Sequence, residues 1–104
     1  MAAVLVYITT RDADEAKRVG TVLIEKRLAA CVNILENMHS MYHWQGVVEC
    51  SRETVLLAKT RESLVGELVE AVKSAHSYEC PCIVAVPVLG GNPDFLAWIE
   101  QETK

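Results

Sequence analysis

The sequence has no run of basic residues and little excess charge of either sign. Its 104 residues include 10 Lys and Arg against 14 Asp and Glu, which gives a formal net charge of −4. Binding to a nucleic-acid backbone or to an anionic membrane surface requires clustered Lys and Arg side chains. We therefore expect neither nucleic acid nor a membrane to be a partner of this protein.

Two kinds of hydrophobic segment are also missing. No apolar stretch is long enough to span a bilayer. The first residues, MAAVLVYITTRDADE, lack a basic start and reach charged residues too early for a secretory leader. Without such a leader, the four cysteines are expected to be reduced thiols rather than a disulfide framework. The sequence therefore predicts a cytoplasmic protein.

The composition is that of an ordinary globular chain. Hydrophobic residues make up 51% of the sequence and charged residues 23%, which excludes extended disorder. A chain of this length forms a hydrophobic core without help from a disulfide or a metal ion. We therefore predict a single domain that spans residues 1–104.

Hydrophobic periodicity predicts four strands and three helices. In chain order they alternate as strand, helix, strand, strand, helix, strand and a short C-terminal helix. The first six elements follow the ferredoxin-like β-α-β-β-α-β plan, an α+β sandwich with a long central hairpin. The predicted strands cover residues 3–10, 29–35 with an extended continuation to 44, 47–60 and 81–88, and the predicted helices begin near residues 12, 61 and 93.

Polar residues mark the predicted helix starts. Asp12 precedes the first helix, and Glu15 follows it at the spacing of a capping box. Thr60 is predicted to cap the second helix, and Asn92 to cap the third with Pro93 in its first turn. We also expect an interruption of the third strand near residues 51–52.

The central hairpin, roughly residues 32–60, is longer than the other strands can match. Its far end, MHSMYHWQGVV, carries Met, Tyr and Trp side chains around a predicted turn at Gln45-Gly46. A protruding strand pair with aromatic faces promotes aggregation unless another subunit covers it. We therefore expect an oligomer that pairs through the edges of this hairpin. The alternative is a hairpin that folds back over its own sheet.

Five segments form a pattern in order and in spacing. They are EKRLAACVNI (25–34), SMYHWQG (40–46), ETVLLAKT (53–60), HSYECP (76–81) and GNPDFLAWI (91–99). Together these segments resemble the family of CutA divalent-cation-tolerance proteins.

The resemblance implies a function as well as a fold. It implies a homotrimer in which the hairpins of neighbouring subunits extend one another's sheets. It also implies binding of Cu²⁺ or another divalent cation and a response to metal ions, with no enzymatic reaction and no organic cofactor. Trimeric PII-type proteins share the architecture. The alternative is therefore a small-effector sensor, or an interaction scaffold, with a ligand cleft between subunits.

The segment around residues 76–82 holds the predicted metal ligands, His76, Glu79, Cys80 and Cys82. Imidazole suits Cu(II) and Zn(II), and two cysteines spaced two apart on a strand share a face. The alternatives are structural. His76 then bonds a carbonyl of the last helical turn, and the cysteines are small apolar residues at the start of a buried strand.

Two positions weaken the expected copper affinity. In some bacterial members of the family, the resemblance implies copper ligands at two adjacent histidines and at a cysteine in the first strand. Here Ala75 and Ile8 stand at the corresponding positions. The resemblance therefore implies weaker metal binding than in those members.

A polar cleft between subunits is the second predicted site. It is expected to contain Tyr42, Trp44, Lys59, Tyr78 and Glu79. A buried Lys59–Glu79 pair satisfies both charges. The pair fits a structural contact that holds the trimer and a ligand-binding cleft equally well.

Overall fold

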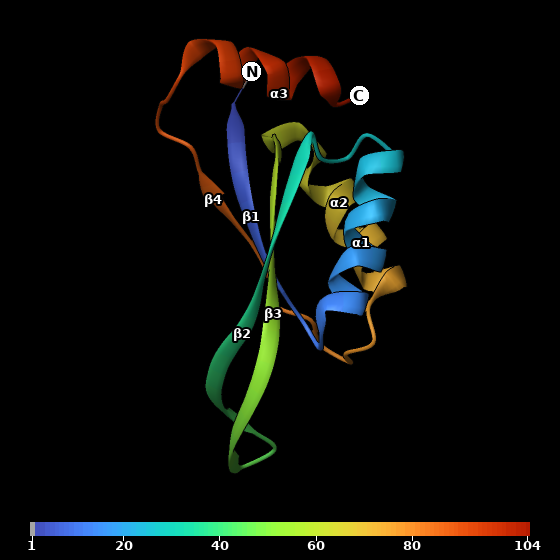
Figure 1. The fold of residues 1–104 in the computed structure, drawn as a ribbon, viewed down its shortest axis with the longest axis vertical. Coiled ribbons are helices and arrows are strands. Elements are labelled where there is room, and N and C mark those ends of the chain that lie inside the picture. Colours follow the sequence, from blue (N-terminus) through green and yellow to red (C-terminus); the bar gives the residue numbers. More distant parts are fainter. Residues whose placement is uncertain (1) are drawn as a thin grey trace.

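The structure is a computed structural model that describes residues 2–104 (Figure 1). Its elements are β1 (Ala3–Thr10), α1 (Ala13–Glu25), β2 (Cys31–Trp44), β3 (Val47–Arg61), a 3₁₀ turn (Glu62–Leu64), α2 (Val65–Ala75), β4 (Ile83–Pro87) and α3 (Pro93–Glu102). The strands form one antiparallel sheet in the order β2-β3-β1-β4. The predicted α+β, ferredoxin-like class is therefore confirmed.

The two long helices cover only one face of the sheet (Figure 1). Val4, Val6 and Ile8 of β1 are buried in the core beneath them, whereas Leu5 and Tyr7 alternate onto the other face and are half-buried. The first strand is therefore fully buried only on its helix-facing side. The remaining buried core residues are Val19, Leu23, Leu28, Ala29, Leu56, Ala58, Leu64, Leu68 and Val72.

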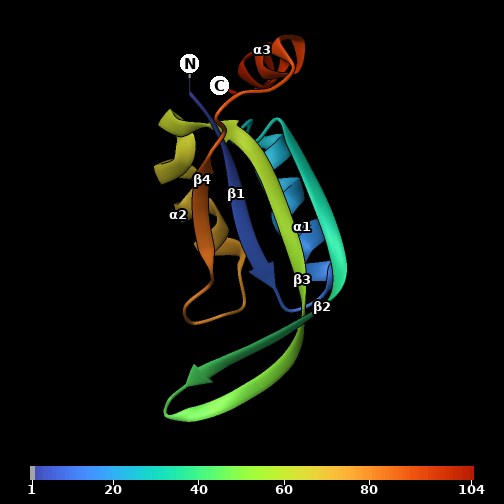
Figure 2. The same cartoon turned by 90° about the vertical axis from the view of Figure 1, so that its left-hand side faces the viewer.

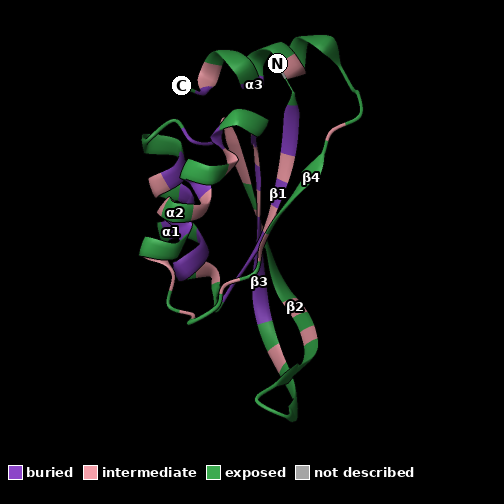
Figure 3. Ribbon diagram, turned by 180° about the vertical axis from the view of Figure 1, so that it is seen from behind, coloured by how far each residue is buried: buried purple, intermediate pink, exposed green. Residues whose placement is uncertain are grey.

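The second face of the sheet is largely uncovered in a single chain (Figure 3). β4 forms an edge of the sheet, where Val84 pairs with Tyr7 and Val86 with Leu5. Val84 is 51% exposed and Val86 is 48% exposed. Of the three helices, α3 lies against this side, over the ends of β1 and β3 (Figure 1). We call the side that carries these valines the open face.

The predicted cap at Thr60 is wrong. Thr60 is paired with Val4 inside β3, and Arg61 is still paired with Ala3. A 3₁₀ turn follows, and α2 begins at Val65 without a side-chain cap. The ladder hydrogen bonds to β1 keep the backbone extended beyond Thr60 and outweigh its local tendency to start a helix.

A bulge bends the central hairpin. Leu35 pairs with Val55, but the next pair joins Met38 to Glu53, so β2 has one residue more than β3 between these pairs. Asn37 absorbs the extra residue with a φ of 62°. Beyond the bulge the hairpin curves toward the side of β4 (Figure 2).

The bulge lies in β2, so the expected interruption at residues 51–52 is wrong. Those two residues pair regularly with Ser40 and His39. Because of the extra residue, odd-numbered side chains of β2 lie on the open face before the bulge, and even-numbered side chains lie on that side after it. As a result, Tyr42 and Trp44 lie on the same side of the hairpin as the open face.

Gly46 and Gly66 give a matched test of the backbone conformations in the hairpin turn and in α2. Gly46 has a φ of 82° in the two-residue hairpin turn, and Gly66 lies in α2; a Cβ atom would meet no neighbour at either position. We expect Gly66→Ala to raise the free energy of unfolding by about 0.5–1 kcal/mol through helix propensity. Gly46→Ala should lower it by about 1–2 kcal/mol because of left-handed strain.

Urea unfolding of both variants, at one protein concentration, checks this prediction. Because neither methyl group meets a neighbour, packing contributes equally to both measurements. A gain of stability in Gly46→Ala would contradict the turn geometry described above.

Candidate functional site

His76 anchors the segment of residues 76–82, which we call the corner, between α2 and β4. Its Nε2 donates a hydrogen bond of 2.7 Å to the carbonyl oxygen of Thr9, and its Nδ1 accepts one of 3.0 Å from the N–H of Tyr78. The imidazole is completely buried. A carbonyl oxygen only accepts, so Nε2 carries the proton and Nδ1 uses its lone pair on Tyr78. The imidazole therefore lacks a free lone pair for a metal ion.

The hydrogen bonds of His76 differ from both sequence-based interpretations. The structural alternative expected a bond to a carbonyl in the last turn of α2, but the partner lies at the end of β1. The metal-ligand prediction would require His76 to give up its bond from Tyr78. In the single chain, His76 serves to fix the corner against the first strand.

Glu15 is the second anchor of the corner and was not among the predicted site residues. Its side chain is fully buried, although it carries a carboxylate. Oε1 accepts a hydrogen bond of 2.9 Å from the N–H of Arg11, and Oε2 accepts one of 3.0 Å from the N–H of Ser77. Arg18 pairs with Oε2 at 3.3 Å. The carboxylate thus joins the start of α1 to the corner.

The capping-box spacing was the sequence signal for this arrangement. Asp12 accepts a hydrogen bond of 2.9 Å from the N–H of Glu15, which confirms the predicted N-cap. The Glu15 side chain, however, reaches the N–H of Arg11 instead of that of Asp12. Spacing alone gives no indication that its second oxygen binds residue 77.

The pKa of Glu15 reflects the same contacts. Burial by itself raises the pKa of this carboxyl group. The hydrogen bonds from Arg11 and Ser77 more than offset that effect and hold the pKa below its usual value. Glu15 is therefore ionised at neutral pH and strengthens the hydrogen bonds that it accepts.

A groove of about 630 Å³ lies between the corner, β1 and the bent hairpin (its setting is seen in Figure 2). Its walls come from residues far apart in the sequence. They are Tyr7, Thr9, Ser40, Tyr42, Trp44, Glu53, Ser77, Tyr78, Glu79, Cys80 and Cys82.

Tyr78 and Glu53 connect the corner to the hairpin. The Tyr78 hydroxyl donates a hydrogen bond of 2.8 Å to Oε2 of Glu53, whose side chain is buried. Burial, this hydrogen bond and the negative charge of Glu53 raise the pKa of Tyr78 well above its usual value. The phenol therefore stays neutral and holds Glu53 in place at the groove.

Four of the five predicted cleft residues line this groove, namely Tyr42, Trp44, Tyr78 and Glu79. Lys59 is the exception. Its Nζ donates to Oδ1 of Asn33, lies 3.5 Å from Sγ of Cys31 and stands 5.8 Å from the centre of the Phe95 ring.

Within a single chain, Lys59 and Glu79 do not pair, and the pair expected in a cleft between subunits stays a prediction. Lys59 pairs with Leu5 in the β1 ladder, whereas the corner lies beside Thr9 at the other end of that strand. Strand register, which the sequence pattern did not define, separates the two charges. The contacts of Lys59 place it beside α3 instead.

The remaining predicted metal ligands, Glu79, Cys80 and Cys82, are exposed and line the groove. The cysteines do not begin a buried strand, because β4 is an exposed edge. Desolvation and the nearby charge of Glu53 raise the pKa of the Cys82 thiol. Within residues 2–104, no three His, Cys, Asp or Glu residues lie close enough together to hold a metal ion. The four predicted ligands thus do not form one site within a chain.

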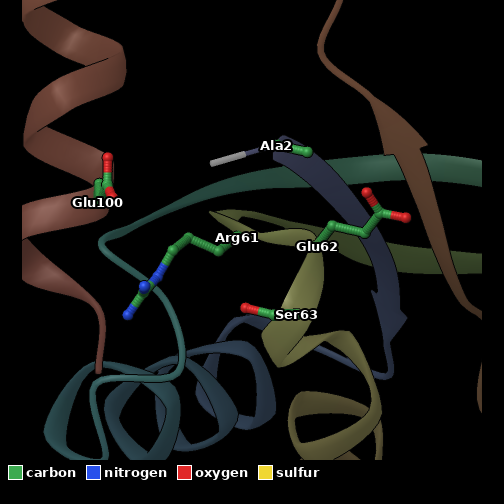
Figure 4. A pocket seen from close by; sticks show the side chains of 5 residues that line it. All are labelled: Ala2, Arg61, Glu62, Ser63 and Glu100. Atoms are coloured by element: carbon green, nitrogen blue, oxygen red, sulfur yellow. The ribbon is translucent and has the colours of Figure 1, made fainter.

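A second cavity, of about 570 Å³, lies near α3 and the chain termini (Figure 4). Its walls include Arg61, Glu62 and Glu100. Arg61 is already bonded to the side chain and carbonyl of Thr103, at 2.8 and 2.9 Å. Figure 4 shows the side chains of Arg61 and Glu62 pointing in opposite directions. The charged groups of this second cavity therefore do not converge on a ligand.

Fold and groove together define a small ferredoxin-like α+β protein with an open groove that holds carboxylates and thiols. The family described as "CutA1 divalent ion tolerance protein" matches residues 4–102. The chain belongs to this family.

Relatives and solved structures agree with this assignment. Divalent-cation tolerance protein CutA of Archaeoglobus fulgidus is 42% identical over 96 residues, which are 92% of this chain and 93% of that protein. The crystal structure of CutA1 from Oryza sativa has a TM-score of 0.97 at 39% identity and covers 100% of this chain and 95% of that one. The divalent cation tolerance protein Cut A1 from Thermus thermophilus has a TM-score of 0.96 at 40% identity, with coverages of 98% and 99%.

The plant relatives are longer than this chain. Protein CutA 1, chloroplastic, of Oryza sativa subsp. japonica is 40% identical over 102 residues, which are 98% of this chain but 58% of that protein. The chain thus spans little more than half the length of that relative. In the part of the chain that the structure describes, no helix is long and apolar enough to cross a membrane.

Replacing Glu15 tests its role as an anchor. Glu15→Gln should lower the free energy of unfolding at pH 7 by about 2–4 kcal/mol, since an amide group would face two N–H donors in a buried site. The wild-type advantage is fully present above the unfolded-state pKa of glutamate, near 4.5. It is lost as the pH falls through the lower folded-state pKa, so the difference between the two proteins should narrow there.

Urea unfolding at pH 7 and in steps from pH 5 to pH 2 measures both effects. Glu25→Gln is the matched control, because Glu25 is exposed at the end of the same helix. It should change the stability by less than about 0.5 kcal/mol. Equal effects of the two substitutions would contradict the anchoring role.

Proposed function

We propose that the chain is one subunit of a homotrimer that binds copper or another divalent cation and contributes to tolerance of such ions. The proposal extends the family assignment, whose description names divalent ion tolerance. The relatives from Archaeoglobus fulgidus and Thermus thermophilus carry the name "Divalent-cation tolerance protein CutA".

The composition of the groove is the observation that carries the metal proposal. Two thiols, Cys80 and Cys82, and two carboxylates, Glu53 and Glu79, line it, and no Lys or Arg is among its lining residues. Thiolates bind copper and zinc, and carboxylates add negative charge. We assign Cys80, Cys82 and Glu79 as the ligands of one chain. A neighbouring subunit would complete the coordination, because His76 is held by its hydrogen bonds.

The open face supports the trimer. It exposes Val84 and Val86 at one edge of the sheet and Leu35, 55% exposed, on the other edge strand. At the hairpin end, Val47 and Val48 are 59% and 62% exposed. In a trimer, neighbouring chains would bury this apolar surface and pair with the edges of the hairpin. The isolated subunit leaves both the apolar surface and the strand edges open to aggregation.

Binding without catalysis also fits the site. His76 has no free nitrogen lone pair, and His39 and His43 alternate to the side of β2 away from Tyr42 and Trp44, which line the groove. None of the three histidines is therefore placed as a general base in the groove of a single chain.

A reducing compartment suits the four cysteines, which are all free. We therefore propose that the protein works in the cytoplasm. Two plant relatives are named as chloroplastic, and that location is stated of them only.

The trimer predicts the mass in solution. Light scattering after size-exclusion chromatography should give three times the chain mass of 11.5 kDa. Val84→Glu should shift the population toward monomers, because it places a charge on the open face. Val22→Glu is a control in α1, away from the open face, because the half-buried Val22 lies outside the core cluster. A monomeric wild type, or a trimer unaffected by Val84→Glu, would contradict the proposal.

The thiol pair predicts how metal binding responds to mutation. Calorimetric titration of the reduced protein with Zn²⁺, and competition with a chromogenic chelator for Cu⁺, should each show saturable binding. Replacing Cys80 and Cys82 by Ser should weaken binding at least about tenfold, since thiolates are the strongest donors of the groove.

Cys31→Ser is the matched control for the thiol pair. Cys31 lies beside Lys59 and Asn33, outside the groove, and its replacement should leave the affinity unchanged. Absence of saturable binding by the wild type would rule out the metal part of the proposal. Equal losses in the two variants would rule out the groove as its location.

A further inference from the structure

The aromatic residues of the chain gather at the groove to an unusual degree. The sequence contains three tyrosines and two tryptophans. All three tyrosines, Tyr7, Tyr42 and Tyr78, and one tryptophan, Trp44, line the groove. They come from β1, β2 and the corner, so the fold brings them together from separate parts of the sequence.

These aromatic side chains are not needed to close the hydrophobic core. Tyr42 is 43% exposed and Trp44 is 42% exposed. The hydroxyl groups are held by local partners, namely Met38 for Tyr7 and Ser51 for Tyr42. In a single chain, their positions are therefore fixed while part of their surface is accessible from the groove.

The charge at the groove has one sign. Glu53 is 9% exposed, and its Oε2 accepts a hydrogen bond from the Tyr78 hydroxyl. Glu79 adds a second carboxylate at the rim. Among the residues that the structure describes, no Lys, Arg or His lines the groove, and Lys59 of the same chain lies beside α3. An anionic effector would thus meet two negative charges and no positive one.

Aromatic faces combined with a carboxylate are the recognition chemistry of organic ammonium ions. The negative π-face of Trp or Tyr attracts a cation, and the attraction is strongest where water is partly excluded. The groove volume of about 630 Å³ lies within the usual range for small-molecule sites.

We infer that the groove binds a small organic cation with an alkylated ammonium group, seated against Trp44 and Tyr42 and balanced by Glu53. This inference rests on the proposed function in that both assign the groove as a cation site. It differs in the groups used, because the ammonium ion needs the aromatic side chains and Glu53, whereas the metal ion needs the thiols.

Fluorescence of Trp44 provides the test. Trp98→Phe, in α3, removes the only other tryptophan and serves as the background for all measurements. The reduced protein, in buffer with a metal chelator, is titrated with three probes. They are choline, its uncharged isostere 3,3-dimethylbutan-1-ol, and ATP as an anion. We expect a saturable change with choline, binding at least about tenfold weaker for the isostere, and no binding of ATP.

Two substitutions locate the site. Glu53→Gln keeps an acceptor for the Tyr78 hydroxyl but removes the charge, and it should weaken choline binding about tenfold. Glu62→Gln, at the second cavity, is the matched control and should leave binding unchanged. Thermal unfolding followed by circular dichroism verifies that each variant is folded. For Tyr42→Leu, choline binding by isothermal calorimetry should fall without loss of the fold.

The outcomes separate this inference from the metal proposal. Choline binding that survives replacement of Cys80 and Cys82 supports the inference even if no metal binds. Equal binding of choline and its isostere would reduce the groove to an apolar pocket and overturn it. Preferential binding of ATP would overturn it as well. No saturable signal from any probe, as expected if a side chain of a second copy fills the groove, would likewise overturn it.

Discussion

The buried carboxylate of Glu15 is the constraint on which the arrangement of the groove depends. It lies in a fully buried position, yet it is satisfied by the N–H groups of Arg11 and Ser77 and by Arg18. An uncompensated charge in that position would be strongly destabilising, so the corner is held where its N–H group can reach the carboxylate. His76 completes the connection by donating to the end of β1.

Everything along the groove follows from that anchored corner and from one bulge. The corner presents Tyr78, Glu79 and the two thiols, while the extra residue near Asn37 turns Tyr42 and Trp44 toward them. The result is a site with carboxylates, thiols and aromatic faces and without a basic side chain. Electrostatics therefore favour cations, whether a metal ion at the thiols or an organic ammonium ion at the aromatic wall.

Sequence patterns predicted the fold because periodicity and caps act locally. The N-cap at Asp12 and the order of strands and helices were both predictable in this way. What failed depended on contacts between distant segments. Pairing with β1 placed Thr60 in a strand, and the irregularity expected in β3 lies in β2 instead. The ligand role predicted for His76 meets the same difficulty, because its hydrogen-bond partner is supplied by tertiary structure.

Anomalous diffraction from a crystal of the reduced, assembled protein soaked with Cd²⁺ tests the central claim, that this groove is a cation site, most directly. Cadmium resembles zinc in its preference for thiolates, and its anomalous signal locates it without reference to activity. The account predicts a peak bonded to Cys80 and Cys82, with a further ligand from a neighbouring subunit. A peak only at the exposed His39 or His43 of the hairpin, or a groove without any peak, would contradict it.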